Sequence, residues 1–314
     1  MKVASTAAAG GGRGSGSGEV IAIFGPTGVG KTAVAVALGR RLLERGEDPI
    51  AISADALQLY AGLETLTGSP TPQERRELEH RLVGVVPITE RFSAGAYAQR
   101  AHDEIDRALH AGRRPIVVGG TGLYLRAALG ELELRPPPNP QARERWHAAV
   151  EREGPEAIHA QLADRDPEAA RTIDPRDRQR VVRAHELLDA GERPPGGAEL
   201  WTSETRHPTR LFGLVMERDA LYATIDRRVD AMVAAGAARE VEAAAHEGAS
   251  ETARKALGFE ELLRGDVDAM KRNTRRLAKR QLTWMRKLPN VALVDVTGRE
   301  PGDVADELVD TLAT

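Results

Sequence analysis

Residues Gly25 to Thr32 read GPTGVGKT, which matches the G-x-x-x-x-G-K-[ST] pattern of a phosphate-binding loop. An apolar run precedes this loop and a segment of helix-forming composition follows it, which is the context that the pattern requires. Its glycines allow backbone N–H groups to turn toward phosphate oxygens, Lys31 adds a positive charge, and the Thr32 hydroxyl can ligate Mg²⁺. The pattern therefore predicts a site for a diphosphate or a nucleotide triphosphate. The residues of this site are Gly25, Pro26, Thr27, Gly28, Val29, Gly30, Lys31 and Thr32.

Two further polar residues follow apolar runs. Asp55 comes just after Pro49 to Ser53, and Thr121 comes just after Pro115 to Gly120. Open α/β sheets bind ligands at the carboxyl ends of their strands, where both residues would lie. Asp55 could help to hold a metal ion, act as a general base toward a nucleophile, or cap a turn. Thr121 could bond a flat ligand beside its glycine pair or begin an ordinary strand-to-helix turn. The residues themselves leave these alternatives open.

Positioning these residues requires strands that alternate with helices. Short apolar runs with helical segments between them predict a parallel sheet covered on both faces. From Leu134 to Pro140 the chain is rich in proline, and it then reads as helices only until about residue 205. Strand signals return at Thr209 to Met216 and Asn290 to Val296.

We therefore expect an α/β fold, in which a P-loop-containing core has a parallel sheet flanked by helices and carries a helical insertion domain. The expected core comprises residues 19–135 and 205–314, and the insertion domain comprises residues 136–204. Residues 1–18 are small and rich in glycine and serine, which predicts a disordered tail.

The composition of the 314 residues limits the possible functions. The chain has no cysteine, which excludes disulfides and thiolate metal sites and fits a cytoplasmic protein. Its histidines show no metal-ligand spacing, so His80, His102 and the others are expected to be structural or surface residues. The apolar runs are far shorter than the roughly 18 residues that a membrane helix needs. The net charge of −3 offers no overall attraction to nucleic acid, so any such binding must use a local basic surface.

One such surface lies between Lys271 and Lys287, where eight positive charges occur within 17 residues without an acid. The run could bind RNA phosphates or could be a solvated helix face. Trp284 within it could stack on a base, although its spacing from Leu277 favours a core position. Arg176, Arg180 and Arg183 could likewise contact phosphates or pair with neighbouring acids.

Seven motifs follow one another between Val20 and about Lys287. They are GPTGVGKT, ISADALQLY, VVGGTGLYLRAAL, DPRDRQRVVRAHE, RRVDAMVAAGAAREV, ALGFEE and NTRRLAKRQLTWMRK. In this order and spacing, the chain resembles the bacterial tRNA dimethylallyltransferase family, also called tRNA isopentenyltransferases. The resemblance implies transfer of a dimethylallyl group from dimethylallyl diphosphate to the N6 amine of the adenosine 3′ of the anticodon. It also implies that diphosphate is the leaving group and that the tRNAs read codons beginning with U.

The resemblance also implies roles for individual residues. Asp55 would be the general base, Thr121 would contact tRNA near the reacting atoms, and Arg228 would neutralise the leaving diphosphate. Mg²⁺, held in part by Thr32, would be the cofactor. The residues that would contact tRNA are Asp55, Ala56, Leu57, Gln58, Thr121, Arg143, Gln179, Arg180, Val181, Val182, Arg183, Lys255, Ala256, Leu257, Gly258, Phe259 and Glu260. Ala56 and Phe259 depart from the serine and tyrosine common in the family, so those two hydroxyl groups are missing here.

The expected partners are the tRNA anticodon stem-loop and dimethylallyl diphosphate, for a monomer without membrane contact. Three alternatives remain at this stage. A related enzyme could prenylate a free adenine nucleotide, although a small substrate needs neither a helical insertion nor a basic C-terminal segment. A small-molecule kinase could place ATP in the same loop. A non-catalytic RNA-binding protein would have no need of Asp55.

Overall fold

The computed structural model describes residues 18–132, 134–135, 139–195 and 201–313. Apart from Gly18, the tail expected over residues 1–18 lies outside them. Within the described part, the sheet has the strand order β3-β2-β4-β1-β5-β6, and all its neighbouring strands are parallel. The parallel sheet confirms the predicted α/β fold. The strands are β1 (Val20–Phe24), β2 (Pro49–Ser53), β3 (His80–Arg81), β4 (Arg114–Gly119), β5 (Thr209–Val215) and β6 (Val291–Asp295).

The apolar runs of β1 and β2 form interior strands of the sheet, where both sheet faces are covered. Every residue of β1 and of β2 is buried, as expected of strands with helices on both sides. Along β1, Ile21 and Ile23 pack into one core cluster, while Val20, Ala22 and Phe24 pack into the other. The sheet therefore separates two apolar cores.

Helices cover these two faces. On one side, α1 (Lys31–Glu44) packs against α14 (Pro301–Leu312) and lies beside α3 (Pro72–Glu77). On the other side, α4 (Ala94–His110) packs against α5 (Gly122–Leu129). Since β4, β1 and β2 are parallel neighbours, the segments that follow these strands meet at one edge of the sheet. That edge receives the phosphate-binding loop, Asp55 and Thr121.

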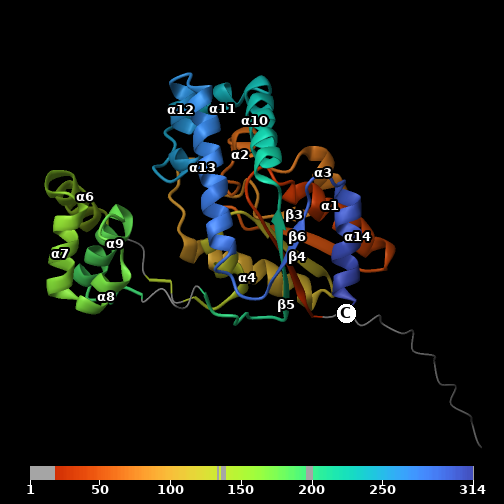
Figure 1. Cartoon of the computed structure of the whole chain (residues 1–314), viewed down its shortest axis with the longest axis horizontal. Coiled ribbons are helices and arrows are strands. Elements are labelled where there is room, and N and C mark those ends of the chain that lie inside the picture. Colours follow the sequence, from red (N-terminus) through yellow and green to blue (C-terminus); the bar gives the residue numbers. More distant parts are fainter. Residues whose placement is uncertain (1–17, 133, 136–138, 196–200, 314) are drawn as a thin grey trace, which may run out of the picture.

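A second group of helices lies beyond the carboxyl ends of the strands, at the top of Figure 1. They pack against the short helix α2 (Glu64–Thr67) and against one another. They close the edge of the sheet on which the phosphate-binding loop lies. Their bounds are α10 (Arg218–Ala234), α11 (Ala237–Glu247), the 3-10 turn η2 (Ala253–Lys255), α12 (Phe259–Leu263) and α13 (Val267–Met285).

Among the described residues, the four helices between α5 and β5 form a separate bundle beside the core (Figure 1). Proline occupies the first turn of α6, α7 and α8, where a missing backbone N–H is tolerated. The helices pack around their own apolar residues, including Val150, Ile158, Leu162 and Val181. The domain boundaries at residues 136 and 204 stay predictions. The bundle comprises α6 (Pro140–Glu153), α7 (Pro155–Arg165), α8 (Pro167–Thr172) and α9 (Arg178–Asp189).

Among the described helices, none combines the length and the apolar character that a bilayer crossing requires.

Candidate active site

The phosphate-binding loop connects β1 to α1 and turns through glycines. Gly28 and Gly30 have φ angles of 84° and 92°, which side chains rarely tolerate, and Gly30 is the N-cap of α1. A Cβ atom at Gly28 would lie 2.8 Å from the Ile225 side chain of α10. The Pro26 and Val29 side chains are buried. The loop can therefore offer an anion some of its backbone N–H groups and the side chains of Thr27, Lys31 and Thr32.

Lys31 is held in the curve of this loop. Its Nζ atom donates to the carbonyl oxygens of Gly25 and Pro26, each at 2.9 Å. Burial lowers the pKa of Lys31 to about 8, with Asp55 opposing this shift and Arg228 adding to it. A bound anion would favour the protonated form of Lys31, so this loop is suited to an anionic ligand.

Asp55 lies in the turn after β2. Its Oδ1 atom accepts the backbone N–H of Leu57 at 3.0 Å, so the capping role considered for this residue is present. The same side chain lines the cavity that contains Lys31. A carboxylate offers about four acceptor positions, so capping a turn leaves it able to accept a proton. The geometry thus permits a structural and a chemical role together.

Two buried tyrosines, Tyr97 and Tyr124, pack near the end of β2. The Tyr97 hydroxyl donates to the Ser53 carbonyl at 3.0 Å, and the Tyr97 and Tyr124 rings lie 4.4 Å apart. Burial raises the pKa of both hydroxyls, with a smaller contribution from the charge of Asp55. The tyrosines therefore stay neutral and act as rigid packing beneath the turn.

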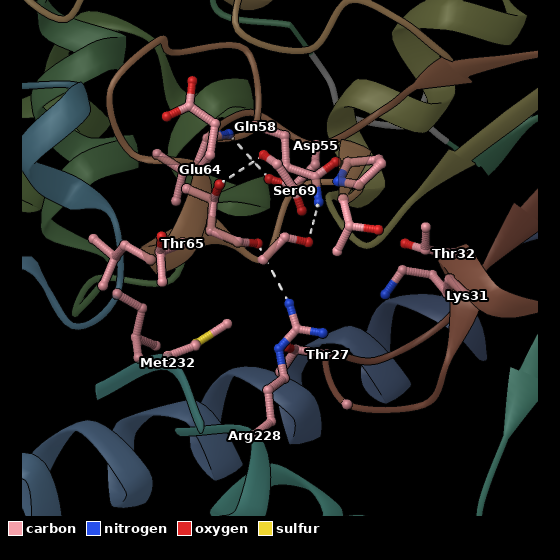
Figure 2. Close-up of a pocket in the computed structure, with 18 of the residues that line it drawn as sticks. Thr27, Lys31, Thr32, Asp55, Gln58, Glu64, Thr65, Ser69, Arg228 and Met232 are labelled. Carbon is pink, nitrogen blue, oxygen red and sulfur yellow. Dashed lines mark hydrogen bonds between the residues drawn. The ribbon is translucent and has the colours of Figure 1, made fainter. Parts of the chain in front are cut away.

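Arg228 reaches the cavity from α10. Its guanidinium donates to the Thr67 carbonyl of α2 at 3.4 Å, and burial lowers its pKa. A Cβ atom at Gly68 would lie 1.9 Å from this guanidinium, so glycine is required at that position for the approach. Figure 2 shows Lys31, Asp55 and Arg228 around one central space. Lys31, Asp55 and Arg228, from three different parts of the chain, face the same cavity, which Glu64, Glu74 and Arg75 also line.

The remaining residues predicted around Asp55 divide into two groups. Gln58 lines the cavity, and its amide is fixed by bonds from the Ser53 hydroxyl at 3.0 Å and to the Gly68 carbonyl at 3.2 Å. Leu57 lines the cavity as well. Thr121 instead meets the neighbouring turn, where its hydroxyl accepts the Ala56 N–H at 3.5 Å. Neither Thr121 nor Ala56 is among the described residues that line the cavity.

Gln281 of α13 is a site residue that the sequence did not indicate. Its Oε1 atom accepts the Thr27 N–H at 2.8 Å, and its Nε2 atom donates to the Gly120 carbonyl at 2.9 Å. The amide therefore joins the phosphate-binding loop to the segment that follows β4. The spacing of Leu277, Gln281 and Trp284 marked a buried helix face, and Trp284 does pack against the main core. That spacing gave no signal for a polar contact with the loop.

These residues enclose a cavity of about 930 Å³. Its polar side contains the phosphate-binding loop, Asp55, Gln58 and Arg228. Its apolar side includes side chains of α2, α10 and α13 and of the turn that follows η2. The apolar residues are Leu66, Val229, Met232, Ala256, Leu257 and Met270. The cavity can thus hold an anion at one end and a hydrocarbon group beside it.

The predicted tRNA-binding segment at residues 179–183 needs a correction. Val181 and Val182 are 0% and 2% exposed in the core of the bundle, so their side chains cannot contact RNA in this structure. Gln179 and Arg180 are exposed on the first turn of α9, and Arg183 is half-buried beside Glu186. Buried and exposed residues occur together because this segment covers both faces of the amphipathic helix α9.

The segment at residues 255–260 is similarly divided. Phe259 is fully buried and Gly258 is buried with it, so neither offers a surface for RNA. Ala256 and Leu257 line the cavity. Lys255 is exposed, whereas the half-exposed Glu260 pairs with Arg254 at 2.7 Å. The buried side chains of this segment therefore cannot contact RNA in this structure, and the tRNA contacts of its other members stay predictions.

The basic run on α13 is partly neutralised by α10. Lys271 pairs with Asp230 at 2.6 Å, and Arg275 pairs with Asp226. These acids lie about 40 to 50 positions away in the sequence, so the run itself contains no counter-charge. The exposed members of the run are Arg272, Arg276, Lys279, Arg280, Arg286 and Lys287. In the bundle, Arg176 pairs with Asp174 and Arg180 with Asp177, as the ion-pair alternative expected.

Similarity to known proteins agrees with this geometry. A family model described as IPP transferase matches residues 58–288. The tRNA dimethylallyltransferase of Thermobifida fusca is 41% identical over 283 residues, which cover 87% of this chain and 88% of that protein. That of Thermomicrobium roseum is 39% identical over 298 residues, or 90% of this chain and 87% of that protein.

Solved structures show the same relationship. The full-length tRNA isopentenylpyrophosphate transferase of Bacillus halodurans is 33% identical, with a TM-score of 0.68 over 95% of this chain and 96% of that one. A eukaryotic dimethylallyltransferase, crystallised while acting on tRNA, is 25% identical, with a TM-score of 0.70 over 89% of this chain and 74% of that one.

The fold and the site define an α/β protein of the P-loop type, with its cavity at the carboxyl edge of a parallel sheet. Together with the matches above, they establish a more specific relationship. The chain belongs to the IPP transferase family.

Proposed function

We propose that this chain is a tRNA prenyltransferase. It transfers the dimethylallyl group of dimethylallyl diphosphate to the N6 amine of the adenosine 3′ of the anticodon, in tRNAs that read codons beginning with U. The observation that carries the proposal is the arrangement of Lys31 and Arg228 opposite Asp55 in one cavity, with an apolar wall beside them. A diphosphate, a short hydrocarbon and a base-assisted nucleophile each have a matching surface there.

The leaving group sets the need for positive charge. As the bond between the allylic carbon and oxygen breaks, its electron pair moves onto the diphosphate, while resonance stabilises the allylic fragment. Lys31, Arg228 and the loop N–H groups are suited to that growing negative charge, because all lie at the phosphate end of the cavity. Burial strengthens their effect, since fixed charges interact more strongly away from water.

The nucleophile needs a proton acceptor. When N6 of the adenosine attacks the allylic carbon, it forms a new C–N bond and must lose one proton. The Asp55 carboxylate is held by the Leu57 N–H and lines the cavity, so it can receive that proton. The products are N6-isopentenyladenosine, diphosphate and the protonated carboxyl group.

Magnesium fits the residues at the phosphate end. The Thr32 hydroxyl lines the cavity beside Lys31, and no group of three acidic, histidine or cysteine residues able to hold a metal is found among the described residues. Mg²⁺ is commonly held by substrate phosphates and water with few protein ligands, which suits this set. When bound, the ion would neutralise diphosphate charge, with Thr32 as its protein ligand.

The adenosine must reach the cavity from a loop of RNA. A single-stranded anticodon loop can turn a base outward at modest cost, and proteins read such bases in pockets. The exposed cations of α13 and of the bundle would meet the surrounding phosphates. Dimethylallyl diphosphate as donor, a monomeric state and a cytoplasmic location complete the proposal.

The test is a product analysis. The protein is incubated with dimethylallyl diphosphate, Mg²⁺ and unmodified tRNA, and the digested RNA is examined by mass spectrometry. Prenylated adenosine next to the anticodon is expected. Parallel reactions with AMP and ADP as acceptors, and with ATP as the sole phosphate donor, test the two enzymatic alternatives. Prenylation of free nucleotide in preference to tRNA, or phosphate transfer from ATP, would contradict the proposal.

A further inference from the structure

Three cations from three separate segments converge on the carboxylate of Glu251. Its Oε1 atom lies 3.2 Å from Lys255 Nζ and 3.7 Å from Arg143 Nη2, and its Oε2 atom lies 3.2 Å from Arg91 Nη2. Arg91 belongs to the loop before α4, Arg143 to α6 of the bundle, and Lys255 to η2. We call Arg91, Arg143 and Lys255 the Glu251 cation cluster.

The charges of this cluster do not balance. One carboxylate meets three cations, and none of the three has another ion-pair partner among the described residues. Arg91 and Lys255 keep 61% and 49% of their side-chain surface exposed, and Arg143 keeps 29%. The surrounding cations hold the pKa of Glu251 below its usual range, with the Lys255 hydrogen bond as the largest cause. A net positive charge therefore faces solvent at this point.

The arrangement resembles the environment of a bound phosphodiester. Such a group also presents two charged oxygens, and lysine and arginine side chains supply most of its contacts in nucleic-acid complexes. Exposed ion pairs contribute little to stability, typically about 0–1 kcal/mol. RNA binding instead gains from the counterions that each neutralised phosphate releases. The carboxylate of Glu251 is thus readily exchanged for a phosphate.

The position of the cluster favours RNA as the partner. Lys255 directly precedes Ala256 and Leu257, which line the cavity. Arg143 connects the helical bundle to the core through Glu251. A phosphate bound here would therefore lie near the cavity and between the two parts of the molecule that flank it.

We propose that Glu251 is an internal competitor of the RNA substrate: it occupies the Glu251 cation cluster, in which Arg91 joins the expected tRNA contacts Arg143 and Lys255, until a backbone phosphate of the RNA displaces it. This proposal rests on the proposed function, since it takes tRNA as the substrate. Glu251 weakens RNA binding, and it also holds Arg143 of the bundle against the core in the free protein.

The experiment compares Glu251→Gln with Glu247→Gln, which removes an equal charge from the exposed end of α11. Binding of unmodified tRNA is measured for both variants and the unchanged protein at several salt concentrations. Glu251→Gln is expected to tighten binding by about fivefold at low salt, and Glu247→Gln by less than about twofold. Arg91→Gln is expected to reduce the salt slope by about one unit. Thermal unfolding of each variant provides the check on folding.

The outcomes separate the two proposals. If the unchanged protein binds and prenylates tRNA while Glu251→Gln behaves like Glu247→Gln or binds more weakly, the internal competitor is refuted alone. If Arg91→Gln did not change the dependence of tRNA affinity on salt concentration, the proposal that the cluster binds a phosphate would be refuted. If the unchanged protein neither binds nor prenylates tRNA, the proposed function fails and this inference fails with it.

Discussion

The side-chain oxygen of Gln281 accepts the backbone N–H of Thr27 at 2.8 Å, although 254 positions separate the two residues. This bond ties the phosphate-binding loop to α13, a helix near the C-terminal end of the chain. Gln281→Ala would leave the Thr27 N–H and the Gly120 carbonyl without this partner. We expect the KM for dimethylallyl diphosphate to rise by about tenfold, since an unpaired buried polar group costs about 1–3 kcal/mol.

Steady-state kinetics of the two substrates check this expectation. Thr283→Ala is the matched control, because Thr283 is exposed on the same helix and its hydroxyl donates to the Lys279 carbonyl of that helix. A positioning role predicts a larger effect on the KM of the donor than on that of tRNA. Equal increases in the KM of the donor and of tRNA, together with a lower melting temperature, would mean that Gln281 only stabilises the fold.

Lys31 should make anion binding depend on pH. Its pKa is lowered to about 8 mainly by burial, so the free protein carries this charge below pH 8 and loses it above. Affinity for inorganic diphosphate should therefore fall as the pH rises from 7 to 9. Lys31→Met should bind weakly throughout and lack this additional dependence, and it should be inactive as a transferase. Calorimetric titrations measure both affinities at each pH. The difference between the two proteins cancels the contribution from protonation of diphosphate itself. If the affinity of both proteins for diphosphate changed equally with pH, or if Lys31→Met were active, Lys31 would not be the cation that binds the diphosphate.

The same shift has a consequence for stability. The folded-state pKa lies below the unfolded value of 10.5, so the unfolded chain binds more protons between about pH 8 and 10.5. The stability of the unchanged protein relative to Lys31→Met should accordingly rise with pH in that window. Urea unfolding at pH 7.5 and 9.5 measures the difference. If the difference in the free energy of unfolding between the two proteins were the same at both pH values, burial would not lower the pKa of Lys31.

The exposed cations of α13 should contribute to the salt dependence of tRNA binding. Replacement of Arg276, Lys279 and Arg280 by glutamine is expected to lower the slope of log K against log salt by about one unit for each lost phosphate contact. Arg275→Gln is the contrasting variant, because Arg275 pairs with Asp226 and should affect stability more than the slope. An unaltered slope in the triple variant would mean that this helix face is only solvated.

Met232 should limit the size of the transferred group. It lies one helical turn beyond Arg228 on α10, and its Cε atom is 3.0 Å from the position of a Cβ at Gly68. Its side chain lines the cavity, as Figure 2 shows. Met232→Ala should shift the ratio of kcat/KM toward a ten-carbon allylic diphosphate by about tenfold or more, as expected for added space in an apolar pocket. Met216→Ala, outside the cavity, is the control, and an identical ratio in both variants would exclude the role.

Much of the fold could be predicted because its information is local. Five apolar runs became β1, β2, β4, β5 and β6 with bounds that differ by one residue at most from those expected. The two-residue strand β3 was not predicted, since His80 and Arg81 carry no apolar pattern and are set by pairing with Ala51 and Ile52. The phosphate-binding loop and the turn at Asp55 were likewise recognisable from contiguous residues.

The rest of the site depends on contacts between distant segments. Gln281 had no local signature, because its partners are backbone groups of two other loops. The pairing of Arg275 with Asp226 joins two helices that the sequence read separately. Family motifs also combine exposed and buried positions, which is why Val181 and Phe259 were assigned to a surface that they do not reach.

The central claim is proton transfer to Asp55 during departure of diphosphate, and Asp55→Asn tests it most directly. Asparagine keeps an oxygen for the Leu57 N–H, so the turn is retained, but its amide is a very poor proton acceptor. Single-turnover prenylation of tRNA by Asp55→Asn should slow by about 100- to 10,000-fold, while its affinity for tRNA stays within about twofold. Prenylation at the unchanged rate would contradict the account.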